Sequence, residues 1–135
     1  MLVMSRNKFG HQYYSLIGGG VDIGETIEQS LIRELSEETG VVMANPRLVI
    51  IEDAGEIYGQ QHIYQCDYVS GQPRLDPNSS EAKISQAGQN TYNPLWLPLK
   101  DLPAANLLPK ELKATILECI SKGFPPEPIK LTIED

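Results

Sequence analysis

Three consecutive glycines, Gly18 to Gly20, end an apolar strand pattern and open a loop that leads into acid-rich sequence. Residues 19–41 contain six acidic residues and one arginine. They therefore carry five of the seven net negative charges of this 135-residue chain. A glycine loop joined to concentrated acid predicts one functional region at this place, because glycine lets the backbone approach a ligand closely.

The acid-rich sequence has the end signals of a helix. Thr26 can accept from the backbone as an N-cap, and Gln29 stands three residues later, as in a capping box. Gly40 suits the left-handed conformation that commonly follows the last helical residue. Between these signals we predict an amphipathic helix over Thr26–Thr39.

Three glutamates share one face of this helix. Glu34, Glu37 and Glu38 have the spacing i, i+3 and i+4, which places their Cβ atoms about 5–6 Å apart. Two of them lie in the last turn, where the helix dipole disfavours anions. The arrangement becomes favourable when a hard divalent cation sits among the oxygens, and open coordination positions suit Mg²⁺ with phosphate oxygens. The spacing therefore indicates phosphoryl chemistry at a metal site.

The complete pattern is G-x5-E-x7-R-E-U-x-E-E-x-G-U, where U is an aliphatic residue. It resembles the box of the Nudix hydrolases at all nine specified positions: Gly19, Glu25, Arg33, Glu34, Leu35, Glu37, Glu38, Gly40 and Val41. The resemblance implies an α/β fold, a Nudix-type α/β/α sandwich with a mixed β-sheet, as one domain over residues 1–135. The family usually has a further strand and turn upstream, so we expect either that this sequence is trimmed at its N-terminus or that the first strand is absent.

The resemblance also implies an activity, namely metal-dependent hydrolysis of a diphosphate linkage in a nucleoside diphosphate derivative. The substrate would be a nucleoside triphosphate, a dinucleoside polyphosphate or a nucleotide sugar, and the cofactor Mg²⁺ or Mn²⁺. The alternative is a catalytically idle nucleotide-sensing or protein-interaction module on the same fold, because a fold alone does not prove chemistry.

Residue roles follow from the same resemblance. The expected metal ligands are the main-chain oxygen of Gly19 and the three glutamates of the helix face. Glu25 and Arg33 are expected to pair and to fix the loop against the helix. The general base stays open between Glu34 or Glu37 within the box and Glu81 in a later polar segment.

The rest of the chain supplies strand, loop and helix signals around this region. The residues from Gly71 to Asn90 are rich in Gly, Pro, Ser, Asn and Gln and predict a long surface loop. Pro109 and Gly123 bound a second amphipathic helix with Leu112, Ile116 and Ile120 on its apolar face. Strands are predicted at Leu2–Met4, Tyr13–Ile17, Arg47–Glu52, His62–Val69 and Tyr92–Leu99, followed at the end by a proline-rich tail.

Composition limits partners and location. A net charge of -7 and a pI near 4.8 disfavour nucleic acid as a bulk partner. We expect no membrane contact and a cytoplasmic protein with reduced thiols, because apolar runs are short and no export signal stands at the first residues. An exposed sheet edge would favour a homodimer. The basic residues Arg6, Lys8, Arg74 and Lys83 are expected to be solvated.

Overall fold

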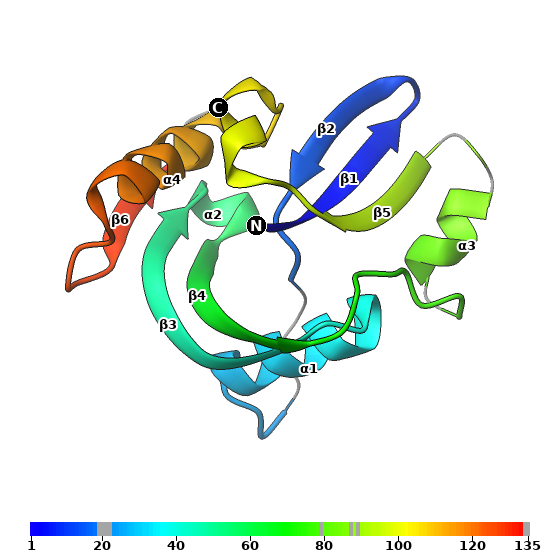
Figure 1. The fold of residues 1–135 in the computed structure, drawn as a ribbon, viewed down its shortest axis with the longest axis horizontal. Helices are drawn as coiled ribbons and strands as arrows, with labels where there is room; N and C mark the ends of the chain where they lie inside the picture. The colour runs from blue at the N-terminus through cyan, green and yellow to red at the C-terminus, as the bar shows by residue number, and fades with distance from the viewer. Residues whose placement is uncertain (19–22, 79, 87, 89, 134–135) are drawn as a thin grey trace.

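The computed structural model describes residues 1–18, 23–78, 80–86, 88 and 90–133 (Figure 1). Its strands and helices are interspersed along the chain. In order they are β1 (Leu2–Lys8), β2 (His11–Ser15), α1 (Ile27–Thr39), β3 (Val42–Asp53), α2 (Gly55–Tyr58), β4 (Gln60–Ser70), α3 (Ser80–Gln86), β5 (Asn90–Trp96), the 3₁₀ helix η1 (Leu99–Ala104), α4 (Lys110–Lys122) and β6 (Ile129–Thr132). None of the helices in this part of the chain is long and apolar enough to cross a membrane.

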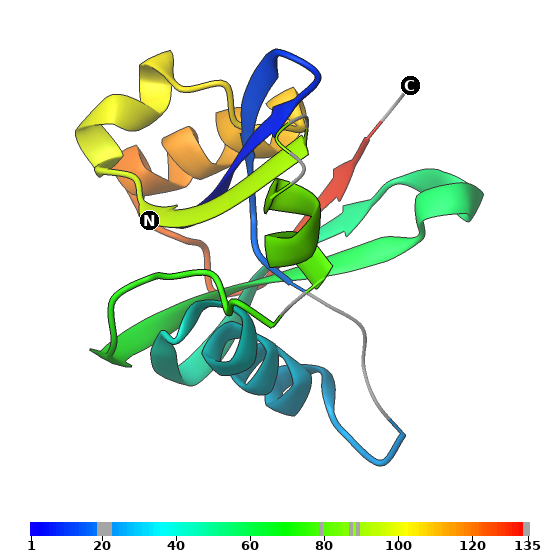
Figure 2. The ribbon, with the colours of Figure 1, turned by 90° about the vertical axis from the view of Figure 1, so that its right-hand side faces the viewer.

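The strands form two three-stranded sheets. The first has the order β2-β1-β5 and is antiparallel, and the second has the order β4-β3-β6. In the second sheet β3 pairs antiparallel with β4 and parallel with β6. The predicted α/β class with mixed strand pairing is confirmed. Figures 1 and 2 show η1 and α4 on one side of the β2-β1-β5 sheet and α1 and α3 on the other.

The α1 helix has the predicted ends. The Thr26 hydroxyl accepts from the Gln29 amide at 3.1 Å, and the Gln29 side chain accepts from the Thr26 amide at 2.9 Å. Gly40 adopts φ 73° and donates its amide to the Ser36 carbonyl at 3.0 Å. Leu35 is buried on the apolar face, so the opposite flank with the glutamates is left for other contacts.

Residues 71–76 hold the C-terminal turn of α1. The Arg74 amide donates to the Thr39 carbonyl at 2.9 Å, and the Asp76 amide donates to the Glu38 carbonyl at 3.3 Å. Gly71, at φ +97°, lies against the Gly40 carbonyl so closely that an added Cβ would collide with it. These bonds satisfy carbonyl groups that a helix end otherwise leaves unpaired.

Part of the predicted loop is helical. The helix α3 interrupts the segment from Gly71 to Asn90, and Ala82 on it is buried. The Tyr92 amide of β5 donates to the Ser85 hydroxyl at 2.8 Å, which fastens α3 to the first sheet. The long-loop prediction was therefore wrong for residues 80–86, because a tertiary contact stabilises a helix that local composition disfavours.

Three further expectations near the C-terminus need correction. The strand predicted to run to Leu99 ends at Trp96, because Pro98 is followed by η1. The proline-rich tail contains β6, which pairs with β3. In α4, Leu112, Ile116 and Cys119 are buried, whereas Ile120 is 41% exposed. The main core gathers the side chains of Val3, Val49, Ile50, Leu97, Leu102, Leu107, Leu112 and Ile116.

We expect Thr26→Ala to lower the free energy of unfolding by about 1 kcal/mol, because it removes the side-chain half of the capping box. Thr26→Ser keeps a hydroxyl and should stay close to wild type. Urea denaturation followed by circular dichroism measures both. Equal stability of the alanine variant and the wild type would show that the cap does not hold α1.

One ionisable side chain is buried away from the glutamate face. Glu52, in β3, is 3% exposed, and its Oε2 atom has no hydrogen-bond partner among the described residues. Burial, and then the negative charge of Glu111, raise the pKa of its carboxyl group. The folded state therefore favours the protonated form of Glu52.

The raised pKa of Glu52 predicts a pH effect on stability. The folded state binds the proton of Glu52 more tightly than the unfolded state does. The contribution of Glu52 to stability is therefore complete below the pKa of the unfolded state and is lost as pH rises through the pKa of the folded state. Glu52→Gln should remove the loss of stability that the titration of Glu52 causes as pH rises. Unfolding free energies measured from pH 4 to pH 8 should fall less in the variant than in wild type, and parallel curves would contradict the assignment.

Candidate active site

Arg33 is the centre of an ion-pair cluster at the start of the site. Its Nε and an Nη atom contact the two carboxylate oxygens of Glu25 at 2.7 and 2.9 Å, which is a bidentate arrangement. The same guanidinium group lies 3.1 Å from Glu34 and 3.0 Å from Glu37. Arg33 therefore ties the residue before the N-cap to the glutamate face of α1.

Glu38 has the most strongly altered ionisation in the site. Burial raises the pKa of this carboxyl group to about 8, with a hydrogen bond to Glu34 and the negative charges of Glu34, Glu81 and Glu37 acting in the same direction. A hydrogen bond between two carboxyl groups needs a proton, so Glu34 and Glu38 hold a proton as a pair. Four carboxyl groups from α1 and α3 thus interact within one region.

A cavity of about 180 Å³ adjoins these carboxyl groups. Its walls come from β1, from the end of β2 and the residues up to Gly18 that follow it, from α1 and α3, and from β5. The lining residues are Met4, Arg6, Ser15, Leu16, Ile17, Gly18, Glu38, Glu81 and Tyr92. Sequence segments between Met4 and Tyr92 therefore meet around Glu38 and Glu81.

The predicted site residues have different positions around this cavity. Glu38 and Glu81 line it, and Glu34 contacts Glu38 with a side chain that is 16% exposed. Glu37 is 61% exposed and contacts Arg33. The expected ligand Gly19 lies outside the described residues, although Gly18, the residue before it, lines the cavity.

Arg6 is the cavity residue whose position the sequence analysis missed. It is only half exposed and lines the cavity, contrary to the expectation that it would be solvated. Its guanidinium carbon lies 3.7 Å from the centroid of the Tyr92 ring. No local signal identifies this role, because the contact joins β1 to β5 across most of the chain.

The donor set suits a hard divalent cation. Among the described residues, no group of three or more His, Cys, Asp or Glu side chains is arranged around one point as metal ligands. Burial and then the neighbouring carboxyl groups raise the pKa of Glu38, and a cation among the oxygens would relieve the repulsion between them. Carboxylate oxygens are also the ligands that Mg²⁺ and Mn²⁺ prefer.

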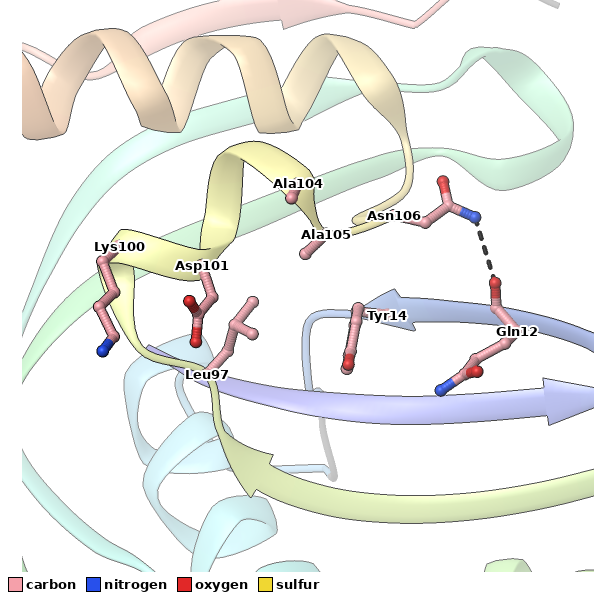
Figure 3. A pocket seen from close by; sticks show the side chains of 8 residues that line it. All are labelled: Gln12, Tyr14, Leu97, Lys100, Asp101, Ala104, Ala105 and Asn106. Atoms are coloured by element: carbon pink, nitrogen blue, oxygen red, sulfur yellow. Dashed lines mark hydrogen bonds between the residues drawn. The ribbon is translucent and has the colours of Figure 1, made fainter.

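A larger cavity, of about 550 Å³, lies on the other face of the first sheet. Gln12 and Tyr14 point to that face, because Ser15, next to Tyr14, lines the cavity with Glu38. Figure 3 shows these side chains below η1, with the Asn106 amide donating to the Gln12 carbonyl at 3.2 Å. The charged residues that line it are Lys100 and Asp101, so this cavity lacks the carboxyl cluster.

The fold and site define an α/β protein in which a capped acidic helix and Gly18 border one cavity. The model of the NUDIX domain matches residues 1–118, and the chain belongs to the Nudix hydrolase family. The resemblance seen in residues 19–41 is thereby confirmed.

Relatives of this chain include bacterial proteins named NAD-capped RNA hydrolase NudC. The protein from Pectobacterium atrosepticum is 26% identical over 120 residues, covering 88% of this chain and 43% of the relative. The protein from Haemophilus influenzae is 31% identical over 105 residues, covering 78% of this chain and 37% of the relative. The protein from Vibrio cholerae is 33% identical over 90 residues, covering 67% of this chain and 29% of the relative. The chain therefore spans less than half the length of these relatives.

We expect the Glu25–Arg33 pair to contribute a coupling energy of about 0.5–3 kcal/mol to folding, because the contact is bidentate and partly buried. A double-mutant cycle with Glu25→Gln and Arg33→Gln measures it by urea denaturation. The pair between Arg47 and Asp67, at 3.0 Å and about half exposed, is the control ion pair and should couple more weakly. Equal coupling in the two pairs would contradict a special role for Glu25.

Proposed function

We propose that this chain hydrolyses a diphosphate linkage in a nucleoside diphosphate derivative, with a divalent cation as cofactor. The observation that carries the proposal is the cavity that Glu38, Glu81 and Gly18 line together. Family membership supports the reaction class. The name of the relatives adds a dinucleotide with an internal pyrophosphate, NAD, to the substrate classes.

Glu34, Glu37 and Glu38, with the backbone of Gly19, are the proposed ligands of Mg²⁺ or Mn²⁺. When bound, such a cation would neutralise phosphate oxygens and activate water. The protein supplies fixed oxygens for it, since Arg33 restrains Glu34 and Glu37 and residues 71–76 hold the turn that carries Glu38. Glu25 and Arg33 are the proposed structural supports of the site.

Glu81 is the best supported general base of the three candidates. It lines the cavity and acts on the pKa of Glu38, whereas Glu37 is largely exposed and contacts Arg33. In the proposed step the water oxygen bonds to phosphorus, and its proton passes to the Glu81 carboxylate. The bridging P–O bond breaks with its electrons on the leaving phosphate, which gives two phosphate esters from a dinucleotide.

A substrate panel tests the proposal. Purified protein is incubated with nucleoside triphosphates, nucleotide sugars, dinucleoside polyphosphates and NAD, each with Mg²⁺, with Mn²⁺ and with EDTA. We expect turnover of at least one class with metal and its loss with EDTA. Calorimetric binding of a nucleotide without any turnover would contradict hydrolysis and favour the alternative of an idle sensing module.

We predict that Glu38→Gln lowers kcat by about 100-fold or more, because it removes a charged oxygen from the proposed cation site. Glu118→Gln makes the same chemical change on the exposed part of α4 and should leave kcat unchanged. Thermal unfolding of both variants serves as the folding control. Near wild-type turnover by a folded Glu38→Gln protein would remove Glu38 from the proposed ligand set.

A further inference from the structure

Arg6 adds a positive charge to a cavity that is otherwise acidic. It comes from β1 and lines the cavity with Tyr92 of β5, whereas Glu38 and Glu81 come from α1 and α3. Among the described residues, Arg6 forms no ion pair with a carboxylate, and its side-chain hydrogen bond goes to the neutral Asn90. Its charge therefore remains available to a ligand.

The guanidinium group of Arg6 is held in one orientation. One Nη atom donates to the Asn90 side-chain oxygen at 2.9 Å. The group stacks over Tyr92, with its central carbon 3.7 Å from the ring centroid, and the Tyr13 ring lies 5.6 Å away. A cation fixed in this way loses little conformational freedom when it binds an anion.

Arg6 also has an unused donor. Its Nε atom is buried and has no hydrogen-bond partner among the described residues. A buried N–H without an acceptor costs free energy, and a ligand oxygen would recover it. The Nε and Nη donors of a guanidinium group match two oxygens of one phosphate group.

From these observations we propose that Arg6 binds a phosphate group of the substrate directly. The inference rests on the proposed function, because it assigns Arg6 to the same cavity. The carboxyl groups would face the part of the diphosphate that carries the cation, and Arg6 would hold non-bridging oxygens from the wall formed by β1 and β5. This second attachment would orient the diphosphate for attack by water.

Binding of inorganic pyrophosphate in the presence of Mg²⁺, measured by calorimetry, tests Arg6 separately from catalysis. We expect Arg6→Gln to weaken this binding by about 10- to 100-fold, since a charged hydrogen-bond donor is lost. Arg6→Lys keeps the charge but not the planar donor pair, and it should weaken binding by a smaller factor. If Arg6→Gln does not fold, Arg6→Lys still tests the role of Arg6.

Lys8→Gln is the matched control. Lys8 lies two residues farther along β1, is exposed and does not line the cavity, so its loss changes the net charge equally. It should alter pyrophosphate binding by less than about twofold, because an exposed side chain that does not line the cavity makes no direct hydrogen bond to an anion bound there. An equal effect of Lys8→Gln and Arg6→Gln would overturn the proposal in favour of bulk charge, as would unchanged binding in Arg6→Gln.

The two proposals can fail separately. With the nucleotide that wild type hydrolyses fastest, Arg6→Gln should raise KM by the same factor as the pyrophosphate Kd. If no nucleotide is hydrolysed but Arg6→Gln alone loses pyrophosphate binding, the proposed function fails and the role of Arg6 stands. If wild type does not bind pyrophosphate, the role of Arg6 is refuted, whatever the substrate panel shows.

Discussion

The guanidinium group of Arg33 makes the acidic helix compatible with a folded protein. Three carboxylates lie within 3.1 Å of its nitrogens, those of Glu25, Glu34 and Glu37. Glu25 stands before the helix and the other two stand on it, so one cation both reduces repulsion along α1 and fixes the chain that enters it. Burial, and then the remaining repulsion between carboxyl groups, raise the pKa of Glu38.

The C-terminal end of α1 connects this cluster to the rest of the site. Residues 71–76 bind the carbonyl groups of Glu38 and Thr39, and the same stretch of chain continues toward α3, which carries Glu81. Ser85 then joins α3 to Tyr92 of β5. These hydrogen bonds hold both α1 and α3 in place, and carboxyl groups that are far apart in the sequence line one cavity.

Local signals were sufficient for the elements whose determinants lie close together. The α1 helix was predictable because its cap, its apolar stripe and its terminal glycine all fall within residues 26–40. The helix α3 and the strand β6 were not, because Ser85 depends on Tyr92 and the four residues of β6 depend on β3. Proline and glycine nearby made both segments look irregular.

The residues of the candidate site also differ in whether local sequence or long-range pairing brings them together. The Nudix box identified Glu34, Glu37 and Glu38 as one chemical group, since helical periodicity alone puts them together. The position of Arg6 in the site could not be predicted from local spacing, because only the pairing of β1 with β5 brings it beside Tyr92. The role of Glu81 as base stays a prediction that its place in the cavity supports.

The register between β1 and β5 links the cavity to the chain's long-range architecture. Arg6 lies opposite Tyr92 and Met4 lies opposite Pro94, so one wall of the cavity is made entirely by strands from distant parts of the sequence. A slip of one residue would turn Arg6 toward the other face of the sheet. Helical periodicity alone can thus gather the three glutamates of α1, whereas Arg6 reaches the cavity only once β1 has paired with β5, and Glu81 only once α3 has joined that sheet.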